Sequence, residues 1–156
     1  MDDIQELETN QFVEPLTIDK IRELWAQTYN RDGKPDWSHI FPYYHDDIVF
    51  EDSIQHIEGK AEFMAVCNRL SKRCEQLHMD ILSIVMDAHQ VFFQWKMVMM
   101  FKKWPSTPLQ GCTKLTIGDD NRIIYQRDYF DLWGTIINGI PLLRNSYWKF
   151  MHRYFG

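Results

Sequence analysis

The chain has 156 residues, 45% of them hydrophobic and 15% aromatic, and its formal net charge is −5 at pH 7 with the histidines neutral. This length suits one globular domain with a sizeable core, so we expect a single domain over residues 1–156. No run of Lys and Arg exceeds two residues, which argues against a nucleic-acid partner. No apolar run approaches the roughly 18 residues of a transmembrane helix.

The three cysteines, Cys67, Cys74 and Cys112, are odd in number and show no CxxC spacing. This pattern argues for reduced thiols and against a disulfide framework or a zinc site. No second His or Cys stands at ligand spacing from His56, and we expect neither a metal nor a cofactor. The acidic amino terminus differs from the basic start of a secretory signal, so a cytoplasmic location is expected.

The first quarter of the chain predicts a tail and two helices. Residues 1–14 are acidic and polar, which is typical of a terminal tail. Apolar residues recur at helical spacing over 16–30 and predict an amphipathic helix. A second, short helix is predicted over 37–44 with Asp36 as its N-cap, although Pro42 is unfavourable in a helix interior.

The next segment predicts a turn, a strand and a third helix. Residues 45–47 (His-Asp-Asp) are typical of a turn, and 48–52 are typical of a strand. Alternation places Phe50 and Asp52 on the same face of that strand, so the strand ends with a carboxylate on an apolar face. Residues 59–74 predict an amphipathic helix with a clear apolar stripe.

Strand-like patterning follows over 77–117, interrupted around 87–90 and 104–108. One face of the middle strand is apolar throughout and is expected inside; it consists of Phe93, Trp95, Met97, Met99 and Phe101. The opposite face is too apolar for simple exposure to solvent. We therefore expect a second copy of the chain to cover it, which predicts a homodimer formed through the outer sheet face.

The last predicted strand, 122–131, carries charge inside a strongly strand-forming segment. Alternation predicts one face made of Ile124, Gln126, Asp128 and Phe130. It predicts a second face made of Ile123, Tyr125, Arg127, Tyr129 and Asp131. Each face carries a carboxylate, and a carboxylate that faces a cavity needs a partner or a chemical purpose.

Residues 132–156 are predicted to form a helical extension at the carboxyl terminus. The segment 142–156 mixes aromatic with basic side chains. Two interpretations stay open for it. The helix packs its apolar side on the domain, or it makes a peripheral contact with an anionic membrane surface.

The order of these elements, together with YYHDDIVFEDSIQHIEGKAEF at 43–63 and GDDNRIIYQRDYFD at 118–131, resembles the nuclear transport factor 2-like superfamily over residues 17–132. This superfamily includes SnoaL-like proteins, ketosteroid isomerases and limonene epoxide hydrolases. The resemblance implies an α+β fold, in which a cone-shaped, strongly curved antiparallel sheet wraps on amino-terminal helices around a deep apolar pocket. It also implies dimers formed through the outer sheet face.

The segment that ends at Asp52 resembles the ketosteroid isomerase segment whose aspartate moves the proton. The two oxyanion donors of that family do not follow. One of them falls on Thr113 and the other near Trp25 or Ala26. The resemblance therefore does not imply steroid isomerisation, because donors to the developing oxyanion usually supply the largest electrostatic term in such a reaction.

The segment RDYFD resembles a strand of limonene epoxide hydrolases and matches Asp128 to an aspartate of their catalytic set. The arginine and second aspartate of that set fall on Trp95 and Met97. Their water-holding tyrosine and asparagine fall on Phe50 and Asp52. Epoxide hydrolysis by the same set is therefore not implied either.

Asp52 and Asp128 are the two residues that still match catalytic aspartates after both comparisons. If they share one apolar cavity, desolvation raises their pKa values, and one acts as acid and the other as base. In the alternative, Asp52 caps the turn that follows it and Asp128 is a satisfied structural carboxylate. His56 lies close enough in sequence to Asp52 to reach the cavity mouth.

The candidate catalytic residues are therefore Asp52 and Asp128. The candidate substrate-binding residues are Trp25, Phe50, His56, Trp95, Met97, Met99, Thr113 and Gln126. We expect the pocket to bind a small apolar or lipid-like molecule, with aspartate-based acid/base chemistry of isomerase or hydratase/hydrolase type. The alternative is a non-catalytic ligand-binding or dimeric interaction protein whose terminal helix contacts a membrane surface, so the sequence leaves catalysis open.

Overall fold

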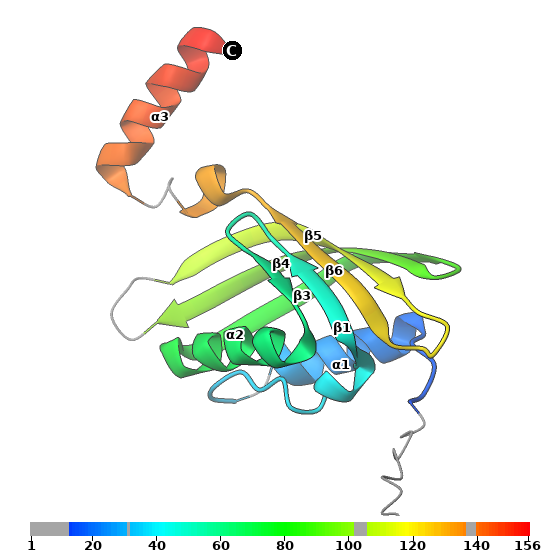
Figure 1. Ribbon diagram of the computed structural model, residues 1–156. Helices are drawn as coiled ribbons and strands as arrows, with labels where there is room; N and C mark the ends of the chain where they lie inside the picture. The colour runs from blue at the N-terminus through cyan, green and yellow to red at the C-terminus, as the bar shows by residue number, and fades with distance from the viewer. Residues whose placement is uncertain (1–12, 31, 102–105, 137–139) are drawn as a thin grey trace, which may run out of the picture.

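The computed structural model describes residues 13–30, 32–101, 106–136 and 140–156. A curved sheet of six strands, in the order β2-β1-β6-β5-β4-β3, lies over the helices α1 and α2 (Figure 1). This arrangement confirms the predicted α+β cone. Most of the predicted tail, residues 1–12, lies outside the described residues.

The two long helices under the sheet confirm the amphipathic patterns. Helix α1 spans Ile18–Tyr29 and begins at Thr17, whose hydroxyl accepts a 3.1 Å hydrogen bond from the backbone N–H of Lys20. Helix α2 spans Lys60–Arg73 and follows Gly59, whose φ of +87° suits glycine. The side chains that bury these helices against the sheet are Ile21, Leu24, Trp25, Phe63 and Cys67.

The short helix expected over 37–44 is smaller than predicted. Only Phe41–Tyr43 is helical, as a 3-10 turn (η1) with Pro42 in its first turn. Asp36 accepts a 2.9 Å hydrogen bond from the backbone N–H of Ser38, so it closes a turn and caps no α-helix. Proline offers no backbone N–H and blocks a longer helix here.

The expected turn at 45–47 is also wrong, because these residues belong to strand β1, Tyr44–Glu51. The pairing register of β1 shifts between Tyr44 and Val49, and this irregularity allows successive polar residues to face solvent. A short strand β2, His56–Glu58, pairs antiparallel with β1. Strand β2 was not predicted from the sequence.

Four further strands complete the sheet: β3 (Cys74–Asp87), β4 (Gln90–Phe101), β5 (Thr107–Ile117) and β6 (Ile123–Phe130). They pair antiparallel in sequence order. The sheet is nevertheless mixed, because β1 pairs with β6 in parallel.

The concave face of the sheet forms the core with α1 and α2. Phe93 and Trp95 are almost fully buried, and Met97 and Met99 pack against them, which confirms that this face of β4 is inside. The predicted alternation of β6 is wrong at its start, where Ile123 is buried and Ile124 is exposed. A register shift in the pairing of β5 with β6 explains the difference. From Gln126 onward the predicted alternation agrees with the structure.

The carboxyl-terminal extension begins with a π-helical turn, η2 (Leu132–Ile136), and ends in helix α3 (Pro141–Tyr154). Helix α3 stands away from the sheet (Figure 1). Most of its large apolar side chains are exposed, so the interpretation in which they pack on the domain does not describe this structure. In the described part of the chain, no helix has the length and apolar character to cross a bilayer.

Candidate functional site

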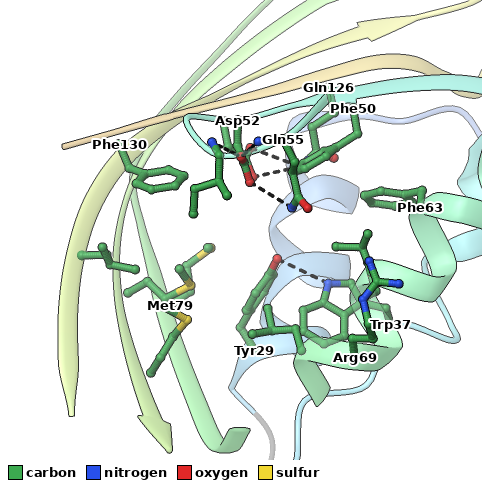
Figure 2. A pocket seen from close by; sticks show the side chains of 18 of the residues that line it. Tyr29, Trp37, Phe50, Asp52, Gln55, Phe63, Arg69, Met79, Gln126 and Phe130 are labelled. Atoms are coloured by element: carbon green, nitrogen blue, oxygen red, sulfur yellow. Dashed lines mark hydrogen bonds between the residues drawn. The ribbon is translucent and has the colours of Figure 1, made fainter. Parts of the chain in front are cut away.

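A cavity of about 360 Å³ lies between the concave face of the sheet and the two long helices (Figure 2). Aromatic and aliphatic side chains provide most of its lining. The polar side chains that reach it are Asp52, Gln55, Arg69, Arg73, Gln126 and Asp128. Apolar walls with a few polar groups are typical of small-molecule sites, and this volume lies at the small end of their range.

Asp128 is the carboxylate of the inner sheet face. Its Oδ1 accepts a 2.7 Å hydrogen bond from the hydroxyl of Thr113, which lies directly opposite it on β5. The side-chain amide of Gln126 donates to Oδ1 at 3.2 Å and to Oδ2 at 3.4 Å. Oδ2 therefore holds only the longest of these bonds and is the oxygen most available to a ligand.

Two buried donors fix the direction of these hydrogen bonds. The indole N–H of Trp95 donates to the Thr113 hydroxyl at 2.9 Å. An indole N–H can only donate, so the Thr113 proton points to Asp128. The hydroxyl of Tyr44 donates to the side-chain carbonyl of Gln126 at 2.6 Å, which turns the amide N–H of Gln126 toward the carboxylate.

Burial raises the pKa of Asp128 to about 6, because the apolar surroundings disfavour its charged form. The hydrogen bonds from Thr113 and Gln126 act in the opposite direction, and the negative charge of Asp52 adds to the rise. Part of the side chain remains accessible because it borders the cavity. Asp128 is therefore a carboxyl group that can gain or lose a proton near neutral pH.

Asp52 borders the same cavity, but its oxygens are used by its own loop. Oδ1 accepts from the backbone N–H groups of Ile54 at 2.7 Å and Gln55 at 2.9 Å. Oδ2 accepts from the side-chain amide of Gln55 at 3.3 Å. Figure 2 shows these bonds at one side of the cavity. Asp52 thus holds the turn between β1 and β2, as an Asx turn does.

Tyr29 presents a second proton-bearing group to the cavity, from the last turn of α1 (Figure 2). Its hydroxyl oxygen accepts a 3.4 Å hydrogen bond from the indole N–H of Trp37. Burial raises the pKa of Tyr29 well above its usual range, and the charge of Asp128 adds to this rise. The hydroxyl therefore stays protonated and can donate to a ligand oxygen.

The model of the SnoaL-like domain matches residues 17–126, which is more than half of the chain. The chain belongs to the SnoaL-like domain family. This match confirms the resemblance seen in the sequence. A comparison with curated protein sequences finds no match.

Solved structures with the same fold are similar to this SnoaL-like protein at low identity. An LEH-like epoxide hydrolase from M. tuberculosis is 22% identical, with a TM-score of 0.59 over 72% of this chain and 80% of the other. A candidate SnoaL-like polyketide cyclase from Shewanella denitrificans is 18% identical, with a TM-score of 0.62 over 76% and 90%. A protein from Catenulispora acidiphila with a ketosteroid isomerase-like fold, in complex with trimethylamine, is 16% identical, with a TM-score of 0.59 over 72% and 84%. At these identities the likeness shows the fold alone.

The structure brings most of the predicted site residues of this SnoaL-like protein to one cavity. Those that line it with Asp52 and Asp128 are Phe50, Trp95, Met97, Met99 and Gln126. Thr113 lies behind Asp128 and holds it in place. Trp25 is buried outside the cavity lining, with its ring edge-on to Phe93 at 5.2 Å. His56 is exposed on β2 and hydrogen-bonds to Glu51 and Glu58 outside the cavity.

Several residues that border the cavity were not predicted as site residues, and those with a polar group or an indole include Tyr29, Trp37, Gln55, Arg69 and Arg73. Tyr29 and Trp37 were assigned only to apolar helix faces. The two arginines lie four residues apart in α2, and this spacing was the available signal that they share a side of the helix. Gln55 gave no signal of its own, since it lies in a loop.

Metal and thiol chemistry find little support in the described residues. They contain no group of three or more His, Cys, Asp or Glu side chains that could hold a metal ion. Cys67 borders the cavity, but burial raises the pKa of its thiol to about 12, so it is protonated and unreactive at neutral pH.

Proposed function

We propose that the cavity binds a small, mostly apolar molecule that carries an oxygen function, and that Asp128 transfers a proton to or from it. The observation that carries this proposal is a carboxyl group with a pKa of about 6 at the border of an apolar cavity. At pH 7 about a tenth of such a group is protonated, so both forms are available for acid/base catalysis.

The hydrogen bonds support separate roles for two side chains. Oδ2 of Asp128 removes a proton from a C–H group of the ligand or from a water molecule, while Thr113 and Gln126 hold the carboxylate in place. The hydroxyl of Tyr29 donates to the ligand oxygen on which negative charge develops. Asp52 positions the loop at the cavity edge.

The separate roles of Asp128 as base and Tyr29 as hydrogen-bond donor favour proton transfer of isomerase or hydratase/hydrolase type. Relatives in fold include a protein described as an epoxide hydrolase and a candidate polyketide cyclase, which is compatible with such chemistry. Trp95 and Met97 stand where the resemblance to limonene epoxide hydrolases places an arginine and an aspartate. The mechanism proposed here therefore uses one carboxyl group and one phenol.

Turnover of a chemical panel tests the proposal. The panel contains β,γ-unsaturated ketones, cyclic enones and aliphatic epoxides, assayed with the wild type, Asp128→Asn and Asp52→Asn. We expect turnover of at least one class and a loss of about 100-fold or more in Asp128→Asn. Asp52→Asn is the matched control and should keep activity within a few fold. Equal turnover by wild type and Asp128→Asn contradicts the proposed role.

A second candidate function is ligand binding without catalysis. Both oxygens of Asp128 already accept hydrogen bonds from Thr113 and Gln126, as in a satisfied structural carboxylate. Trp95 and Met97 supply apolar wall in place of reactive groups. Native mass spectrometry of the purified protein tests this second candidate. A bound apolar ligand that is released chemically unchanged favours binding without catalysis.

We also propose that the outer sheet face binds a second copy of the chain. The pairing register sets Val85, Phe92, Lys114 and Arg127 side by side across four strands. Phe92 is 40% exposed and Val85 is 64% exposed. The row ends at Glu51, which forms an ion pair with Arg127 of the same chain at 2.7 Å. The exposed apolar end of the row, Val85 and Phe92, therefore forms the proposed contact with the second copy. Sedimentation equilibrium of wild type and Phe92→Glu tests this assembly, and a monomeric wild type at micromolar concentration contradicts it.

For helix α3 we propose contact with an anionic membrane surface. Residues 141–156 contain two Arg and one Lys but no Asp or Glu. The exposed side chains Leu143, Phe150 and Tyr154 lie on one side of the helix by their spacing. Trp133 stacks on Tyr147 at 5.8 Å and joins the helix to η2. A basic helix with exposed aromatic side chains is typical of an interfacial segment.

A further inference from the structure

The side of helix α2 that borders the cavity changes from apolar to cationic toward the carboxyl end of the helix. Its lining residues are Phe63, Val66, Cys67, Arg69, Leu70 and Arg73. Arg69 and Arg73 lie one helical turn apart, so both side chains project from the same side of the helix. The cavity is therefore apolar along most of α2 and cationic near the carboxyl end of this helix.

No carboxylate in the described part of the chain forms an ion pair with either of these two charges. Among the described residues, neither guanidinium takes part in a hydrogen bond or an ion pair, and both side chains are exposed. The carboxylates of Asp52 and Asp128 border the same cavity but accept their hydrogen bonds from other groups. Two like charges one turn apart repel each other, and an anion bound between them removes that repulsion.

The helix dipole does not explain this arrangement. Cations in the last turn of a helix offset the partial negative charge of its carboxyl end. Lys72 lies in that last turn of α2 without bordering the cavity. Arg69 lies one turn earlier, where the dipole effect has faded, yet it reaches the cavity lining. Figure 2 shows it extending from α2 on the side where Trp37 lies.

We propose that Arg69 and Arg73 bind a carboxylate group of the ligand, so that the ligand of this cavity is a small amphipathic acid. This inference rests on the proposed function and specifies its substrate class. The paired N–H donors of a guanidinium match the two oxygens of a carboxylate. The apolar body of the ligand then lies against Phe50 and Trp95, and its reacting end reaches Asp128 at the inner sheet face.

Octanoate and octan-1-ol test the inference, because they share an alkyl chain and differ in charge at the head. Trp37 and Trp95 line the cavity, so their fluorescence reports binding of either compound. The variants are Arg69→Gln/Arg73→Gln and, as a control, Lys72→Gln, which removes one positive charge from the same helix outside the cavity lining. Binding is measured at 20 mM and 300 mM KCl.

Wild-type protein should bind octanoate more tightly than octan-1-ol. The double variant should bind octanoate about 10- to 100-fold more weakly than the wild type does, and its affinity for octan-1-ol should be unchanged. High salt should weaken octanoate binding alone, and this comparison needs no variant. The inference is overturned if wild-type protein binds octanoate no more tightly than octan-1-ol. It is also overturned if Lys72→Gln weakens octanoate binding as much as the double variant does. Either result leaves the cavity proposal intact. If neither compound binds, the cavity proposal fails together with the inference.

Discussion

The hydroxyl of Thr113 donates a 2.7 Å hydrogen bond to Asp128 from the opposite position on the neighbouring strand, and Trp95 donates to the same hydroxyl at 2.9 Å. This bond favours the charged form of Asp128 and opposes the effect of burial. The substitution Thr113→Val keeps the shape of the side chain and removes both bonds. We therefore expect the pKa of Asp128 to rise above its value of about 6.

NMR titration of the Asp128 carboxyl carbon measures this change. The control is Thr116→Val, which removes a hydroxyl from the same strand that hydrogen-bonds to Gln90 at 3.3 Å, away from the carboxylate. The control should leave the titration midpoint of Asp128 in place. A midpoint that stays at the wild-type value in Thr113→Val shows that the hydroxyl does not act on the carboxylate.

The raised pKa of Asp128 also makes the protein less stable as pH increases. Unfolded Asp titrates near pH 4 and folded Asp128 near 6, so the folded state binds the extra proton between these values. Stability from this group is complete below pH 4 and is lost as pH rises through 6. Relative to Asp128→Asn, the free energy of unfolding should fall by roughly 2 to 3 kcal/mol between pH 4 and pH 8.

Urea unfolding of the two proteins across this range provides the measurement. Asp87→Asn serves as the control, because Asp87 is exposed at the end of β3. The difference between the wild type and Asp87→Asn should stay flat. If the difference between the wild type and Asp128→Asn is also flat, the carboxyl group titrates alike in the folded and unfolded chain.

Asp52 is expected to matter for stability and not for proton transfer. Asp52→Ala removes the acceptor for the N–H groups of Ile54 and Gln55 and should cost about 1 kcal/mol of unfolding free energy. Asp52→Asn keeps a side-chain oxygen and should cost less. Thermal or urea denaturation of both variants measures this order. Equal losses in both variants would show that the negative charge of Asp52, and not its geometry, holds the loop.

Gly111 provides space for the cavity wall. It lies opposite Trp95 across β4 and β5, and a Cβ there would overlap the indole and come within 2.5 Å of the Tyr129 carbonyl oxygen. Gly111→Ala should therefore destabilise the protein by about 1–3 kcal/mol and shift the fluorescence of Trp95. Gly118→Ala is the milder control, since its nearest contacts would be at 3.1 Å. Similar losses in both variants would argue against a special role for the Trp95 contact.

Helix α3 should carry the binding to anionic membranes. The full chain is expected to float with vesicles that contain phosphatidylserine and to remain in solution with neutral phosphatidylcholine. Replacement of Arg144, Lys149 and Arg153 by Gln should abolish flotation, because each basic residue contributes about 1 kcal/mol near such a surface. The triple change Lys60→Gln, Lys72→Gln and Arg73→Gln in α2 is the charge-matched control. Equal flotation of all three proteins contradicts the role of α3.

The sequence predicted the main elements because their patterns are long and regular. The apolar face of β4 and the stripes of α1 and α2 recur over many residues, and each faces the core as expected. Short and irregular features were less predictable. Pro42 shortened one helix to a 3-10 turn, and a register shift exchanged the faces of Ile123 and Ile124.

Site residues were predicted correctly where strand alternation determines which way a side chain points. They were missed where the packing of helices and loops against the sheet determines it. Asp128 and Gln126 follow from alternation in β6, and both border the cavity. Trp25 and Tyr29 lie one turn apart in α1, but only Tyr29 reaches the cavity. Which turn of a helix meets the cavity depends on how the helix crosses the sheet. His56 was placed near the cavity by its distance in sequence, and strand β2 carries it outward instead.

The most direct test of proton transfer by Asp128 is the pH profile of kcat/KM for the panel compound that the wild type turns over fastest. We predict one ionisation near pH 6 in this profile. Thr113→Val should move it to higher pH, and Asp128→Asn should remove it and lower kcat/KM by at least 100-fold. A profile that is flat between pH 5 and pH 8, or that keeps its shape and rate in Asp128→Asn, would contradict this prediction.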